Sequence, residues 1–84
     1  ERERLFRELG RFDYLRVLPS AANFIYAEVC RGSAPRLTEA LAREGILVRQ
    51  FDVPPPRGGV RITVGRPEEN DLLLEALSRI QPED

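Results

Sequence analysis

The sequence predicts an α+β domain, a two-layer sandwich in which helices cover one face of a mainly antiparallel sheet. Two observations carry this prediction. The periodicity of the apolar residues changes along the chain in the order α-β-β-α-β-β-α. The length of 84 residues suffices for one compact core and for no second domain. We therefore expect residues 1–84 to form a single small domain. The sheet face without helices is then free to contact another domain or molecule.

The first part of the chain predicts one helix and two strands. An apolar stripe runs along residues 1–9, and Gly10 follows it where a left-handed C-terminal cap would stand. The segments 14–18 (YLRVL) and 23–29 (NFIYAEV) are rich in aromatic and β-branched residues, which favour strands. A break at Pro19 separates the two predicted strands.

The segment 31–45 (RGSAPRLTEALAREG) has the features of a complete helix. Ser33 is a suitable N-cap, Pro35 suits the first turn, and Gly45 ends the segment. Leu37 and Leu41 stand four residues apart and therefore share one helix face. That face is predicted to pack on the sheet.

The last part of the chain predicts two strands and a final helix. The strands are residues 46–49 (ILVR) and 60–64 (VRITV), joined by a long loop with three prolines. The helix begins near Pro67 and continues to about Ile80. We expect six residues of the last two helices to pack on the strands: Leu37, Leu41, Leu72, Leu73, Ala76 and Leu77.

The composition excludes several classes of function. A net charge of −1 argues against a nucleic-acid partner, and no apolar run is long enough for a membrane span. The chain has no histidine, which removes histidine-dependent nucleophiles and ordinary zinc sites, so no metal is expected. It has no lysine, so it cannot form a Schiff base with a carbonyl cofactor. We expect a soluble, cytoplasmic segment of a longer chain, with no self-sufficient enzyme within it.

The single cysteine, Cys30, stands at the end of a predicted strand. One cysteine cannot close a disulfide within the chain, which fits a reducing compartment. We interpret Cys30 as a packing residue.

Two arginines stand at the ends of neighbouring predicted strands. If strands 46–49 and 60–64 pair antiparallel, Arg49 and Arg61 both lie near the connecting loop, and Arg57 in that loop is a third candidate. Converging guanidinium groups bind carboxylate or phosphate as bidentate forks. The alternative is that these arginines point into water, since arginine is the only basic residue in the chain. Asn23 is either a second lining residue or a turn former.

Three stretches resemble, in order and spacing, the C-terminal small domain of histidinol-phosphate aminotransferases: PSAANF (19–24), LTEALAREGILVR (37–49) and VRITVGRPEENDLLLEAL (60–77). These enzymes are fold-type I, pyridoxal-phosphate-dependent aminotransferases of histidine biosynthesis. Threonine-phosphate decarboxylases carry a similar segment. The loop QFDVPPPRGG departs from the best-known members, which leaves the substrate open.

The resemblance implies roles for two residues. The arginine of the RIT motif, Arg61, would contact the substrate carboxylate, and Arg61 and Arg49 together would hold a substrate phosphate. The catalytic lysine and the residues that bind pyridoxal phosphate would lie in a large domain outside this chain, so no catalytic or cofactor-binding residue is expected here. The partners implied are an amino acid or phosphorylated amine, the large domain and a second subunit of a homodimer.

A different class of function remains open at this stage. A stand-alone α+β module that binds an acidic metabolite would have the same pattern of elements. The length of the parent chain distinguishes the two hypotheses, because only the aminotransferase needs about 350 residues with an upstream lysine.

Overall fold

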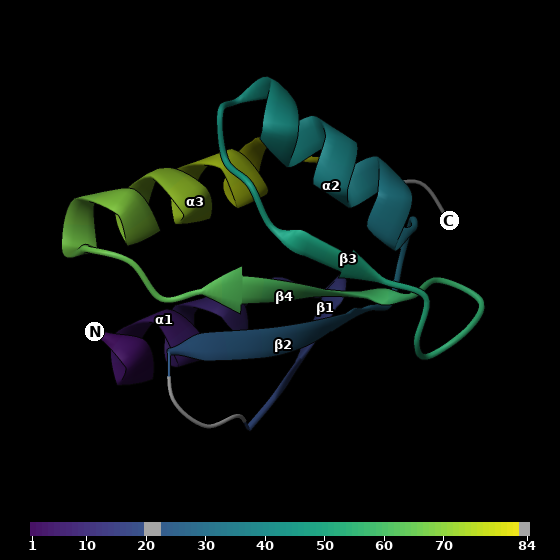
Figure 1. Cartoon of the computed structure of the whole chain (residues 1–84), viewed down its shortest axis with the longest axis horizontal. Coiled ribbons are helices and arrows are strands. Elements are labelled where there is room, and N and C mark those ends of the chain that lie inside the picture. Colours follow the sequence, from purple (N-terminus) through teal and green to yellow (C-terminus); the bar gives the residue numbers. More distant parts are fainter. Residues whose placement is uncertain (20–22, 83–84) are drawn as a thin grey trace.

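A computed structural model describes residues 1–19 and 23–82 of the chain. The predicted α+β class and the order α-β-β-α-β-β-α are confirmed (Figure 1). The elements in chain order are α1 (Arg2–Leu9), β1 (Leu15–Leu18), β2 (Phe24–Val29), α2 (Ala34–Arg43), β3 (Arg49–Phe51), β4 (Gly59–Thr63) and α3 (Pro67–Arg79). Residues 20–22 of the PSAANF stretch lie outside the described residues.

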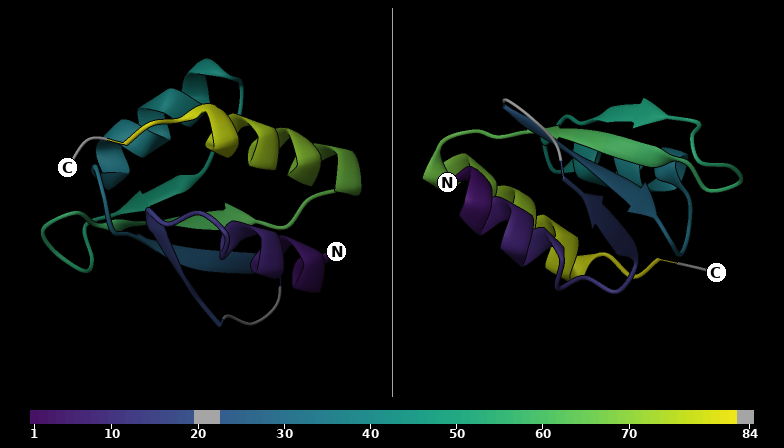
Figure 2. Two further views of the ribbon diagram at one scale, coloured as in Figure 1. Left: turned by 180° about the vertical axis from the view of Figure 1, so that it is seen from behind. Right: turned by 90° about the horizontal axis from the view of Figure 1, so that it is seen from below.

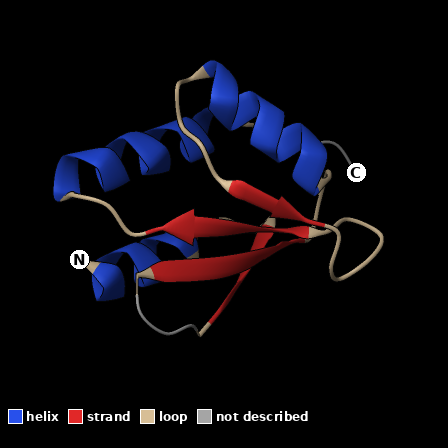
Figure 3. Cartoon of the chain, viewed as in Figure 1, coloured by secondary structure: helices blue, strands red, loops and turns tan. Residues whose placement is uncertain are grey.

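The four strands form one antiparallel sheet in the order β1-β2-β4-β3. Alternate strand residues, such as Ile25 and Ala27 of β2 and Val60 and Ile62 of β4, are buried. They share one hydrophobic core with residues of all three helices, so the helices pack on that face of the sheet (Figure 3). The helical members of this core are Leu5, Leu9, Ala34, Leu37, Leu41, Leu73, Ala76 and Leu77.

Helix α2 begins and ends where its sequence predicts. The Ser33 hydroxyl accepts a hydrogen bond from the backbone N–H of Arg36 at 3.3 Å, which satisfies an otherwise unpaired donor of the first turn. Pro35 stands in that turn, where its missing N–H costs nothing. Gly45 follows the helix with φ of 82°, a left-handed conformation that glycine adopts without steric penalty.

The third strand lies three residues later than predicted. Residues 46–48 are irregular, and β3 begins at Arg49. The loop before β4 is therefore residues 52–58, which project from one end of the sheet (Figure 1). The apolar run before Arg49 suggested a strand, but Ile46 and Val48 pack on the core from an irregular segment instead.

Three further predictions were wrong in detail. Leu72 is 58% exposed because it lies beyond the arc of α3 that Leu73, Ala76 and Leu77 bury. Gly10 has φ of −68°, so α1 ends without a left-handed cap. Cys30 is exposed rather than packed, since it comes directly after the last residue of β2.

Helices α1 and α3 lie side by side, and the N-terminus of the chain is next to the start of α3 (Figure 2). None of the helices in the described part of the chain is long and apolar enough to cross a membrane.

Candidate anion-binding site

Arg49 and Arg61 lie directly opposite each other on neighbouring strands. Arg61 occupies the middle of β4, where its Cα is paired with Arg49 of β3 on one side and Tyr26 of β2 on the other. Residues opposite each other in an antiparallel pair point to the same face of the sheet. Because Val60 and Ile62 are buried under the helices, the two arginines lie on the opposite face. The antiparallel pairing that the sequence predicts is confirmed, although both arginines stand farther from the loop than expected.

The pairing of Arg49 with Arg61 sets two positively charged residues directly opposite each other, an arrangement that destabilises a strand pair. Within residues 1–19 and 23–82, no ion pair with a carboxylate offsets either charge; the described ion pairs involve other arginines, such as Arg4, Arg31 and Arg79. An anion bound between Arg49 and Arg61 would remove this repulsion. Carboxylate and phosphate are suitable anions, since each accepts two parallel hydrogen bonds from a guanidinium.

Aromatic rings surround the arginines on this face. The Arg61 guanidinium carbon lies 5.0 Å from the centre of the Phe24 ring and 5.9 Å from that of Phe51. The Arg49 guanidinium carbon lies 5.5 Å from the same Phe51 ring. These separations are within the range of cation–π attraction. The face therefore combines two cations with apolar rings that reduce their access to water.

Tyr26 connects this face to the loop that follows β3. Its hydroxyl donates a hydrogen bond to the backbone carbonyl oxygen of Val53, and its ring meets the Phe51 ring edge-on at 5.8 Å. Burial raises the pKa of the Tyr26 hydroxyl, with a smaller contribution from Glu28. The tyrosine stays neutral and keeps its proton for the bond to Val53.

The other two candidate residues, Asn23 and Arg57, have their described contacts with residues other than Arg49 and Arg61. The Arg57 guanidinium donates to the carbonyl oxygen of Gly32 at 2.7 Å, so it fastens the loop to the start of α2. Asn23 is exposed, and its carbonyl oxygen accepts from the backbone N–H of Val64 at 2.7 Å, which extends the pairing of β2 with β4. A lining role for Asn23 or Arg57 stays a prediction.

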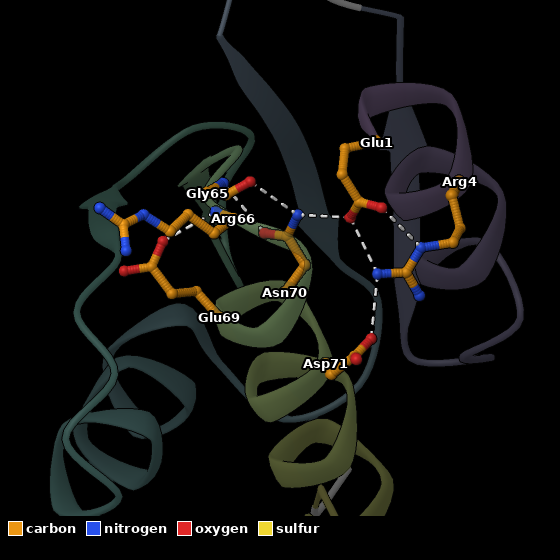
Figure 4. Close-up of polar contacts among 7 residues, drawn as sticks. All are labelled: Glu1, Arg4, Gly65, Arg66, Glu69, Asn70 and Asp71. Atoms are coloured by element: carbon orange, nitrogen blue, oxygen red, sulfur yellow. Dashed lines mark hydrogen bonds and ion pairs between the residues drawn. The ribbon is translucent and has the colours of Figure 1, made fainter.

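The exit of β4 is held by a polar network around Asn70 (Figure 4). The Asn70 side chain is buried, accepts from the Gly65 N–H at 2.9 Å, and donates to the Gly65 carbonyl oxygen and the Glu1 carboxylate. Arg4 binds Glu1 and Asp71 at 2.8 and 2.9 Å. The network joins α1, the end of β4 and α3, and so fixes the strand that carries Arg61.

The hydrogen bonds from Arg4 and, secondarily, from Asn70 lower the pKa of the Glu1 carboxyl to about 2. Glu1 is therefore ionised throughout the neutral range. Asn70 is flanked by Glu69 and Asp71 in the first turns of α3, so its neighbours in sequence gave no signal of a buried contact.

Comparison with known proteins identifies relatives of the chain. No protein-family model matches. The chain is 46% identical over 80 residues to histidinol-phosphate aminotransferase from Dehalococcoides mccartyi, a match that covers 95% of the chain and 22% of the relative. It is 42% identical over 80 residues to chloroplastic histidinol-phosphate aminotransferase 1 from Arabidopsis thaliana, covering 94% of the chain and 19% of that protein. The chain thus spans about a fifth of the length of the curated relatives it matches.

Solved structures share the fold. Histidinol-phosphate aminotransferase from Clostridium acetobutylicum matches with a TM-score of 0.84 and 27% identity, over 93% of this chain and 24% of that one. L-threonine-O-3-phosphate decarboxylase from Porphyromonas gingivalis matches with a TM-score of 0.81 and 29% identity, over 90% of this chain and 24% of that one.

The chain is similar in fold and in sequence to segments of this aminotransferase and this decarboxylase. Its curated relatives are histidinol-phosphate aminotransferases. This finding confirms the resemblance to that family that the three sequence motifs indicated.

Proposed function

We propose that the chain is the small, substrate-binding domain of a histidinol-phosphate aminotransferase, and that Arg61 and Arg49 bind the anionic groups of its substrates. The observation that carries this proposal is the pairing of the two arginines on one sheet face, with no described carboxylate partner. The curated relatives, at 40–46% identity, supply the class of reaction.

The work of this domain is to position the substrate. Two guanidinium forks on paired strands bind a carboxylate or phosphate in one orientation, and the orientation of the reacting amine follows from it. We assign the substrate carboxylate to Arg61, which is half-buried in the middle of the sheet, and assign the phosphate to Arg61 and the more exposed Arg49 together.

The residues of this chain do not fit a covalent site for pyridoxal phosphate, because the chain contains no lysine to bind its aldehyde. We therefore place the cofactor and its chemistry in the remainder of the full-length enzyme and derive no step through it here. The same proposal makes residues 1–84 the C-terminal part of a longer chain, and makes the full-length protein a cytoplasmic homodimer.

Kinetics on the full-length enzyme test this proposal. Arg61→Ala should lower kcat/KM about tenfold to a few hundredfold with every amino-acid donor, because each loses a charge-assisted bidentate contact. Arg49→Ala should harm a phosphorylated donor more than an unphosphorylated one. Arg61→Lys should restore only part of the loss, since an ammonium group cannot reproduce the planar fork.

The exposed Arg2→Ala in α1 is a suitable control for loss of one positive charge, because Arg2 lies on the helical layer of the domain. An Arg61→Ala enzyme within twofold of the unmodified one would show that Arg61 is only a surface residue.

A second candidate is a threonine-phosphate decarboxylase. The match to the Porphyromonas gingivalis enzyme, at 29% identity and a TM-score of 0.81, favours it. The two hypotheses differ in product, so the full-length enzyme should be assayed with L-threonine-O-3-phosphate for release of carbon dioxide and with histidinol phosphate for amino transfer.

A further inference from the structure

We propose that Phe24 and Phe51 hold the Arg61 guanidinium between their rings and thereby fix its orientation before a substrate anion arrives. This inference rests on the proposed function and adds two positioning residues to it. The pair of rings is called the aromatic clamp below.

The clamp follows from the register of three strands. Phe24 of β2 is paired with Thr63, and Phe51 of β3 is paired with Gly59, so each ring stands two residues from Arg61 along β4. The two rings therefore approach Arg61 diagonally, from the neighbouring strands on its two sides. Diagonal neighbours of this kind are within reach of aromatic and long side chains. The distances of 5.0 and 5.9 Å from the guanidinium carbon to the ring centres agree with this geometry.

Phe51 contacts a second arginine on this face. Its ring lies 5.5 Å from the guanidinium carbon of Arg49 as well, so one ring contacts both cations. The edge-on contact with Tyr26 holds this ring, and Tyr26 is itself bonded to Val53. Phe51 therefore positions both arginines, and Phe24 positions Arg61.

The physical advantage lies in the donors that remain. An arginine has five N–H donors and many side-chain rotamers, and ordering it costs entropy when it binds a ligand. A ring contact restricts the side chain without using any N–H donor. Arg61 is thus oriented in advance with its hydrogen-bonding groups available for a carboxylate or phosphate.

Steady-state kinetics on the full-length enzyme measure the effect. Loss of one ring contact corresponds to a change of about two- to fivefold in binding. Phe24→Leu should raise KM by that factor for phosphorylated and unphosphorylated donors alike. Phe51→Leu should do the same for an unphosphorylated donor and raise KM by a further factor of about two to five for histidinol phosphate. Phe24→Tyr and Phe51→Tyr keep the ring and should retain KM.

Phe6→Leu is the matched control. Phe6 on α1 has the same exposed fraction as Phe24, 37%, and belongs to the helical layer rather than to the arginine face. It should leave KM unchanged for both donors.

Nuclear magnetic resonance of Arg61 tests the clamp without any assay of activity. In the unmodified protein, the Arg61 Hε resonance should be shifted upfield by the ring currents of both phenylalanines. Phe24→Leu and Phe51→Leu should each move it toward the position of an exposed arginine, and both tyrosine variants should keep it.

The clamp would be overturned if Arg61 Hε in the unmodified protein had the chemical shift of an exposed arginine. It would also be overturned if Phe24→Leu and Phe51→Leu had the same KM values as Phe6→Leu. If the unmodified full-length enzyme transfers no amino group, the proposed function fails, and the resonance still decides whether the rings hold Arg61.

Discussion

The ring of Tyr26 on β2 lies across Gly59 on β4. A Cβ atom at position 59 would stand 2.6 Å from the tyrosine ring carbon Cζ, closer than real Cβ contacts allow. Glycine at this position therefore lets the Tyr26 hydroxyl reach past β4 to the Val53 carbonyl oxygen. This close approach fixes the loop after β3 to the arginine face.

Gly59→Ala should displace the Tyr26 ring and break its bond to Val53. Overpacking of this kind costs about 1–3 kcal/mol of the free energy of unfolding, which urea denaturation measures. Gly10→Ala is the matched control, since Gly10 has φ of −68° and the nearest atom to its added Cβ is 3.4 Å away. A Gly59→Ala protein as stable as Gly10→Ala would show that the ring moves aside without cost.

Asn70→Ala should destabilise the domain far more than a change at the next residue. The substitution leaves the N–H of Gly65 without its acceptor in a partly buried turn, at a cost of about 1–3 kcal/mol. Asp71→Ala removes only an exposed ion pair with Arg4 and should cost about 0–1 kcal/mol. Thermal unfolding of both variants gives the comparison, and equal losses would contradict the anchoring role of Asn70.

Tyr14→Phe should weaken the domain at neutral pH and alter its response to alkali. The Tyr14 hydroxyl donates to the Leu77 carbonyl oxygen at 2.7 Å, and burial raises the pKa of Tyr14 to about 12, with a smaller contribution from Asp13. Because the folded pKa is above the unfolded value of about 10, the stability from neutral Tyr14 is complete below pH 10 and is lost as the pH rises toward 12.

The loss at pH 7 should be about 0.5–1.5 kcal/mol, the net contribution of one hydrogen bond. Urea denaturation at pH 7 and at intervals from pH 9.5 to 11.5 measures both effects. Tyr14→Phe should show a shallower decline in stability over the alkaline range. A decline as steep as that of the unmodified domain would mean that another group causes it.

The 84-residue chain by itself should neither bind pyridoxal phosphate covalently through a side chain nor transfer amino groups, because it contains no lysine. Borohydride treatment followed by mass spectrometry of the chain with the cofactor should detect no adduct on any side chain. An adduct on a side chain of residues 1–84 would contradict this expectation and would require another nucleophile.

The parts of this structure that depend on local sequence were predictable. The ends of α2 at Ser33 and Gly45 were predictable, because an N-cap and a left-handed conformation each depend on only one or two residues. The adjacency of Arg49 and Arg61 followed from assuming an antiparallel pair, since the arginines stand near the facing ends of two apolar segments.

Features that depend on several strands at once were not predictable. The contacts of Arg61 with Phe24 and Phe51 require the register of β2, β4 and β3 together, and a shift of one residue would turn the rings to the other face. The start of β3 at Arg49 was missed because Ile46 and Val48 pack on the core from an irregular segment, while Leu47 is exposed. The bond of Arg57 to the Gly32 carbonyl was not predictable either, because it depends on the folded path of the loop.

Because side chains alternate along β2 and β4, one set of residues is constrained by packing in the core and the other set is not. Ile25, Ala27, Val60 and Ile62 are confined by the helices, whereas Phe24, Tyr26 and Arg61 lie on the other side of the same backbone. Substitutions on that second side leave the hydrophobic interior intact. Under the proposed function, substitutions at these positions would change the bound ligand while the scaffold remains folded, which makes the sheet an evolvable surface.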